Sequence, residues 1–121
     1  MEEIVLRKNG NEWKVRVGVP SFARREAVRK LTSEFVERAQ AIDELYKDAG
    51  DDARQIVDKA AEVERLTDEF TVRYFKAIAD GVPEELRSDF ESEWTSEFWQ
   101  QQDAVALEEA FRFFRTRGGA R

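Results

Sequence analysis

The chain has 121 residues, a length typical of one domain with a core of its own. It contains no cysteine and no histidine, which excludes disulfides, thiolate metal sites and the commonest catalytic base, and a chain without cysteine is typical of the cytoplasm. Its net charge of −6 argues against nucleic-acid binding, and no apolar run approaches the roughly 20 residues that span a bilayer.

Residues 1–18 carry the pattern of a β-hairpin. The Asn-Gly dipeptide at positions 9–10 tolerates the positive φ angles of a type I′ turn, and apolar residues alternate with polar ones on both sides of it. A two-residue loop pairs Leu6 with Trp13 and places Val15 on the same face. We therefore expect Leu6, Trp13 and Val15 to pack the hairpin against other apolar groups.

The apolar face of this hairpin needs a cover, because a two-stranded hairpin alone is marginally stable. Two arrangements meet this requirement. In the first, the hairpin is a lid on the core of its own chain. In the second, its free edges pair with another copy, which predicts a homo-oligomer.

Two long amphipathic helices are predicted after the hairpin, at residues 21–49 and 52–80. In both segments, apolar residues recur at intervals of three and four, which is the spacing of one helical face. Ser21 suits the N-cap of the first helix, and Gly50 suits the residue just after its end. Because the loop between them is short, we expect the helices to form an antiparallel pair.

Two shorter helices are predicted in the rest of the chain, at residues 83–100 and 103–116. Pro83 suits the first turn of a helix, and Asp103 suits an N-cap. The apolar residues of the first of these helices recur at intervals of four: Leu86, Phe90, Trp94 and Phe98. Residues 117–121 are expected to form a flexible tail.

The predicted fold class is mainly α. A single domain, residues 1–121, would consist of an N-terminal two-stranded β-hairpin followed by a bundle of three to four helices. This architecture places no constraint on chemistry, so function has to be sought in particular side chains.

No catalytic or metal-binding motif is present. Glycine-rich phosphate loops are absent, and the serines and threonines have no histidine to activate them. Acidic residues recur at intervals of four at Glu85, Asp89 and Glu93, but helical di-iron sites also use histidine, so these three are interpreted as a solvated helix face. We expect a protein that is not an enzyme and that needs no cofactor or metal.

Aromatic residues are concentrated between residues 90 and 114, which hold seven of the fourteen, and residues 80–109 hold ten acidic residues and one basic residue. Aromatic side chains dominate interface energetics, and carboxylates steer basic partners. The predicted partner-binding residues are Trp94, Phe98, Trp99, Phe111, Phe113 and Phe114. Trp99 lies off the stripe of four, so we expect the core to need it least. The alternative is that these rings form the core.

A family resemblance extends over part of the chain. Residues 3–17 read EIVLRKNGNEWKVRV, a helix start follows at Pro20-Ser21, and residues 66–86 read LTDEFTVRYFKAIADGVPEEL. This order, a hairpin followed by an all-helical acidic body, resembles the tail assembly chaperones of long-tailed bacteriophages, mainly over residues 3–45. In that family, small cytoplasmic proteins coat the tape measure protein and bring tail tube subunits to it. The resemblance implies a non-enzymatic, protein-binding assembly factor in the host cytoplasm, with the tape measure or tail tube protein as partner.

Two other functions fit the same composition. A small acidic inhibitor or antitoxin-like protein would block a basic, nucleic-acid-binding surface, and the acidic stretch 80–109 suits that role. A head–tail connector would also be helical and would form rings. Rings or open oligomers in solution favour a chaperone or connector, whereas a stable monomer favours the inhibitor.

Overall fold

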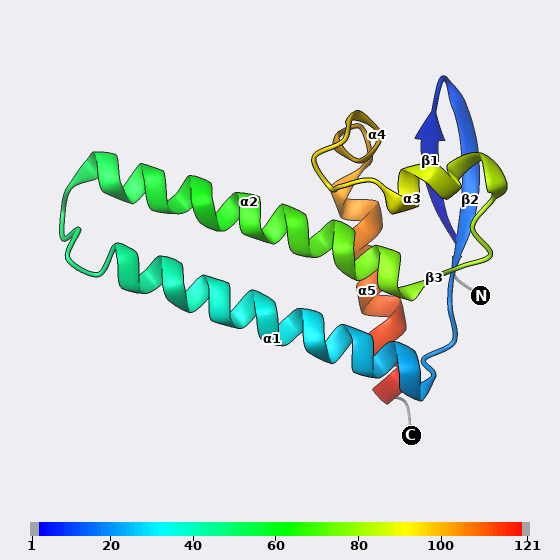
Figure 1. The fold of residues 1–121 in the computed structure, drawn as a ribbon, viewed down its shortest axis with the longest axis horizontal. Helices are drawn as coiled ribbons and strands as arrows, with labels where there is room; N and C mark the ends of the chain where they lie inside the picture. Colours follow the sequence, from blue (N-terminus) through cyan, green and yellow to red (C-terminus); the bar gives the residue numbers. More distant parts are fainter. Residues whose placement is uncertain (1–2, 120–121) are drawn as a thin grey trace.

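A computed structural model describes the backbone of residues 3–119 and the side chains of residues 3–116 (Figure 1). The chain is mainly α, as predicted: a small sheet and several short helices gather at one end of a long helical hairpin, which projects from them. In the part of the chain that is described, no helix combines the length and apolarity needed to cross a membrane.

The sheet has three antiparallel strands in the order β1-β2-β3: β1 (Glu3–Lys8), β2 (Asn11–Val17) and β3 (Ala79–Asp80). β1 and β2 form the predicted hairpin in the predicted register, with Leu6 opposite Trp13. Asn9 and Gly10 have φ angles of 53° and 78°, as a type I′ turn requires.

β3 corrects the prediction that the second long helix continues to residue 80. Ala79 pairs with Val17 of β2, and the Gly18 amide donates to the Ile78 carbonyl at 2.6 Å. A strand of two residues has no periodicity that a sequence pattern could reveal. Its effect is to fasten the end of the long helix to the hairpin.

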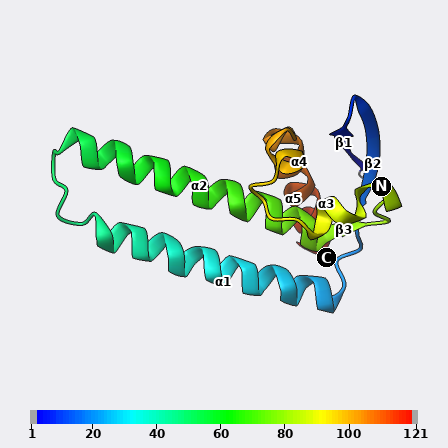
Figure 2. The ribbon, with the colours of Figure 1, turned by 45° about the horizontal axis from the view of Figure 1, so that its top comes forward.

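The long helices are α1 (Phe22–Leu45) and α2 (Ala53–Ile78). They lie antiparallel and side by side, as expected from their short loop (Figures 1 and 2). Ser21 Oγ accepts a hydrogen bond from the Arg24 amide at 3.2 Å, and Asp52 Oδ1 accepts one from the Arg54 amide at 3.0 Å. Both helices therefore begin at a side-chain cap.

The prediction of a single helix over residues 83–100 is wrong. Three short pieces replace it: η1 (Glu84–Leu86), α3 (Arg87–Glu91) and α4 (Glu97–Gln100). Ser92 is extended, with φ −79° and ψ 163°, and its hydroxyl donates to the Asp89 carbonyl at 2.6 Å. Such a local bond competes with the helical ladder and ends α3. Consequently Glu85, Asp89 and Glu93 do not share one helix face.

The last helix, α5 (Ala104–Gly119), begins after Asp103, whose Oδ1 accepts a hydrogen bond from the Val105 amide at 2.9 Å. The predicted cap is therefore confirmed. The helix continues through residues 117–119, where a tail was expected, and residues 120–121 of that tail lie outside the described residues.

The core lies between the sheet, α5, the short helices and the last turns of α2. Its buried apolar side chains include Ile4, Leu6, Val15, Val17, Phe75, Ile78, Leu86, Trp99, Leu107 and Phe114. Leu6 and Val15 are 1% and 0% exposed, and Trp13 packs against the same cluster while half-buried. The hairpin is thus a lid on its own core, which is the first of the two expected arrangements.

Candidate functional site

The helical hairpin of α1 and α2 is buried at one end only. None of the 24 residues of α1 is buried, and the buried residues of α2 begin at Leu66. Figure 1 shows the sheet and the other helices at the proximal end, where α1 begins and α2 ends, while the tip with the connecting loop projects away. Most helical stability comes from packing an apolar face, so the projecting half lacks a cover that such helices normally have.

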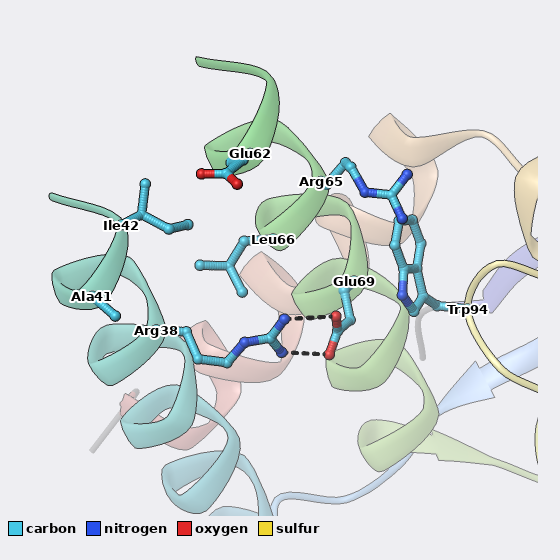
Figure 3. A pocket seen from close by; sticks show the side chains of 8 residues that line it. All are labelled: Arg38, Ala41, Ile42, Glu62, Arg65, Leu66, Glu69 and Trp94. Atoms are coloured by element: carbon cyan, nitrogen blue, oxygen red, sulfur yellow. Dashed lines mark hydrogen bonds and ion pairs between the residues drawn. The ribbon is translucent and has the colours of Figure 1, made fainter. Parts of the chain in front are cut away.

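Ion pairs run along the contact between α1 and α2. The Arg38 guanidinium donates to both carboxylate oxygens of Glu69, at 2.7 and 3.1 Å, as Figure 3 shows. These hydrogen bonds hold the pKa of Glu69 below its ordinary value. Two further ion pairs join the helices: Arg73 with Glu34 at 3.3 Å and Lys59 with Asp43 at 2.9 Å. The helices are therefore joined partly by groups that water can also solvate.

One face of the hairpin has a polar hollow beside Trp94. It has a volume of about 360 Å³ and is lined by Arg38, Ala41, Ile42, Glu62, Arg65, Leu66, Glu69 and Trp94 (Figure 3). Arg65 lies 5.3 Å from the centre of the Trp94 ring, and Arg38 is occupied by Glu69. Its main cations already have partners, so this hollow offers little to a ligand.

The other face has a larger groove between α1, α2 and α5, with a volume of about 810 Å³. Aromatic rings line its floor: Phe35, Phe70, Tyr74, Phe111 and Phe114. Phe35 and Phe70 have ring centres 4.6 Å apart, and Tyr74 stacks on Phe111 at 4.1 Å. Burial raises the pKa of Tyr74. The groove is thus an apolar, aromatic surface that remains open to solvent on one side.

The rim of this groove is mostly cationic. Arg25 and Arg29 contribute from α1, and Arg115 contributes from α5, against one lining acid, Glu108; Arg29 is also paired with Glu26. The chain as a whole carries a net charge of −6, so this rim is a local reversal of sign. An aromatic floor inside a basic rim suits an apolar segment flanked by acidic groups.

An apolar seam continues the groove toward the tip. On α2 its members alternate at intervals of four and three: Ile56, Ala60, Val63, Thr67, Phe70 and Tyr74. On α1 they are Thr32, Val36, Ala39 and Tyr46, and the charged Asp43, which pairs with Lys59, interrupts them. This heptad spacing is the one by which a helix packs against another helix. Val36, Ile56 and Val63 are 44%, 51% and 37% exposed, so no residue that the structure describes covers the distal part of the seam.

The predicted partner-binding residues are divided between core and surface. Phe98, Trp99 and Phe114 are buried, and the Trp99 indole N–H donates to the Asp89 carbonyl at 2.8 Å. The expectation that the core needs Trp99 least is therefore wrong, because the break at Ser92 turns its ring inward.

The remaining predicted rings are half-buried. Trp94 lines the polar hollow, Phe111 lines the groove, and Phe113 packs against the core. Of the predicted set, only Phe111 and the buried Phe114 border the groove. Most of the candidate surface lies on α1 and α2, where sequence reasoning placed only core. The apolar heptad of α2 that includes Ile56 and Val63 was the signal available for it.

The residues that the structure describes hold no group of three or more acidic, histidine or cysteine side chains placed to bind a metal. Comparisons of the chain with protein-family models, with curated proteins and with solved structures found no match. The function therefore has to be inferred from the fold and its surfaces.

Proposed function

We propose that the protein is a non-enzymatic assembly factor that binds a helix of a partner protein along the apolar seam. The observation that carries this proposal is an amphipathic helical hairpin whose seam is uncovered over its projecting half and leads into an aromatic groove. Helix-in-groove recognition uses apolar anchors at the same three- and four-residue spacing.

The side chains of the groove indicate which kind of partner helix would bind there. Phe70 and Phe111 offer flat apolar contact area, and Arg25, Arg29 and Arg115 surround it. An amphipathic helix with large apolar residues on one side and acidic residues at the margins of that side satisfies both features.

The family resemblance supports a partner class. Phage tail assembly chaperones coat the tape measure protein and bring tail tube subunits to it, and the resembling residues 3–45 and 66–86 include α1 and the groove-lining part of α2. We therefore propose helices of a tape measure protein as the first ligand, the tail tube protein as the second, and the host cytoplasm as the site of action.

The test is a binding titration with labelled helical peptides that tile the tape measure and tail tube proteins of a long-tailed bacteriophage. At least one peptide is expected to bind. Val63→Glu places a charge in the seam and should weaken binding about tenfold or more. Val57→Glu is the matched control, since Val57 lies on the same helix, is 64% exposed and is outside the seam. Equal losses in both variants, or no binding by any peptide, would contradict the proposal.

A second candidate, the small acidic inhibitor, is favoured by five exposed glutamates on and around the short helices: Glu84, Glu85, Glu91, Glu93 and Glu97. These carboxylates lie away from the seam and could face a basic surface. Glu91→Lys with Glu93→Lys would abolish binding of that kind and leave groove binding unchanged. A head–tail connector would instead show the mass of a larger closed oligomer in light scattering.

A further inference from the structure

We propose that, before a partner arrives, a second copy of the chain covers the apolar seam in an antiparallel, two-fold dimer. The inference rests on the proposed function only in treating the seam as an interface. A partner helix would then compete with the second copy for the same surface.

The charge of the hairpin is polarised along its length. Residues 22–30, at the proximal end, contain four basic residues and one glutamate, whereas residues 43–52, at the tip, contain five acidic residues and one lysine. α1 has 24 residues and is about 36 Å long, so the two regions lie at opposite ends. An antiparallel arrangement brings the acidic tip of each copy toward the basic rim of the other copy's groove. A parallel arrangement would place like charges together.

The side chains of the seam also suit two-fold symmetry. We place the two-fold axis in the interface, where it crosses α1 near Ala39 and α2 near Val63. Each helix then packs antiparallel on the same helix of the second copy. Because positions on either side of the axis exchange, Val63 meets the second copy's Val63 and Thr67 meets its Ala60. The contact is thus made by small and medium-sized side chains at heptad positions, which lets two helices approach closely.

The size of the seam predicts a weak dimer. α5 occupies the proximal end, so the free seam runs from Thr32 to Tyr46 on α1, about 22 Å at 1.5 Å per residue. Two helices side by side are about 20 Å wide, which gives a footprint of about 450 Å² per copy. Interfaces of this size are transient, which suits a cover that a partner must displace.

Cross-linking tests the geometry directly, because the chain has no native cysteine. Ala39→Cys lies near the proposed axis and should be joined to its symmetry mate by a short bismaleimide. Ala41→Cys is the matched control, since Ala41 lies on the same helix but borders the polar hollow on the opposite face. Equal yields of dimer from the two variants, or none from Ala39→Cys, would overturn the proposal.

Charge reversal tests the orientation. The purified chain should show twice its 14.1 kDa mass in light scattering at high concentration. Arg25→Glu with Arg29→Glu, or Asp48→Arg with Asp51→Arg, should weaken the dimer about tenfold. All four substitutions in one chain should restore it, because each reversed end again meets its opposite.

Two further results would contradict the inference: a monomer at every concentration up to about 1 mM, or no recovery in the fourfold variant. Circular dichroism of each variant distinguishes lost association from lost folding. All of these measurements use the purified chain alone, so failure of the tape measure peptides to bind would leave the dimer standing. A chain that is monomeric but still binds a peptide would contradict the dimer and support the proposed function.

Discussion

The side-chain amide of Gln102 pairs with the backbone of Arg7 as a neighbouring strand would. The Arg7 N–H donates to Gln102 Oε1 at 2.8 Å, and Gln102 Nε2 donates to the Arg7 carbonyl at 2.8 Å. Arg7 lies on β1, whose other edge pairs with β2, so these groups belong to the free edge of the sheet. Gln102 thereby occupies part of the edge that strand pairing between copies would need.

Gln102→Ala should destabilise the fold by about 1–3 kcal/mol, because it removes both partners from the Arg7 backbone. The Arg7 amide should also exchange its hydrogen faster. Gln101→Ala is the control, since the exposed Gln101 side chain bonds only to the Glu97 carboxylate. Denaturant midpoints and hydrogen exchange measure both effects, and equal midpoints for the two variants would refute the role of Gln102.

Trp99→Ala should lower the free energy of unfolding by about 3–5 kcal/mol, the usual cost of deleting a buried aromatic ring. Trp99 is 3% exposed, and the substitution also leaves the Asp89 carbonyl without the indole donor. Trp94→Ala is the matched comparison and should cost less, because Trp94 is half-buried beside Arg65. Guanidinium denaturation measures the free energy of unfolding of both variants. A larger loss in Trp94→Ala than in Trp99→Ala would contradict this prediction.

Stability should fall on acidification partly through Glu69. Its pKa is lowered in the folded state, chiefly by the hydrogen bond from Arg38, so the unfolded chain binds a proton more readily. The stabilisation is complete above the ordinary glutamate pKa, near 4.5, and is lost as pH falls through the lower folded-state value.

Glu69→Gln removes this titration and should flatten the dependence of the unfolding free energy on pH between about 5 and 3. The effect at neutral pH should stay near 1 kcal/mol or less, because Arg38 is half exposed to water. Denaturation series at several pH values measure both quantities. An unchanged slope would show that Arg38 and Glu69 are not coupled in solution.

Gly10→Ala should destabilise the hairpin by about 1–2 kcal/mol, the cost of a left-handed conformation for a residue with a side chain. Gly10 has φ +78°, and an added Cβ would meet no atom within 4 Å, so the cost is conformational and not steric. Asn9→Gly is the control, because glycine also accepts the φ of 53° there. The denaturation midpoint of Gly10→Ala should be clearly lower than that of Asn9→Gly. Equal midpoints would argue against the type I′ turn.

The parts of the fold that local chemistry determines were predictable from the sequence. The Asn-Gly turn and the alternating strands agree on one register, and that register is observed between Leu6 and Trp13. The long helices followed from their periodicity, because a stripe over more than twenty residues leaves little ambiguity.

The break at Ser92 was not predictable in this way. Leu86, Phe90, Trp94 and Phe98 have helical spacing, but a serine hydroxyl bonded to the Asp89 carbonyl ends the helix between them. The spacing of apolar residues shows which face of a helix is apolar. Whether a side chain such as Ser92 bonds to the backbone and ends the helix depends on the surrounding tertiary structure. The inward position of Trp99 follows from this break, so the predicted surface was misplaced with it.

The apolar seam escaped the sequence reasoning for another reason. The apolar face of α2 serves both α1 and the groove, because Phe70 contacts Phe35 of α1 and also lines the groove. A periodic pattern shows that Val63 is apolar and spaced for packing, but not whether the chain itself supplies the cover. Only the position of α5, which reaches one end of the pair, shows that it does not.

The absence of any buried residue in α1 has a consequence for how the molecule opens. Separating α1 from α2 would break contacts such as Arg38 with Glu69, whose groups water can solvate, while the core of Phe75 and Ile78 stayed closed. Amides of α1 should therefore exchange through local opening, and those of the proximal turns of α2 only through global unfolding. The first long helix should therefore separate from α2 at a lower free energy than the core needs to open.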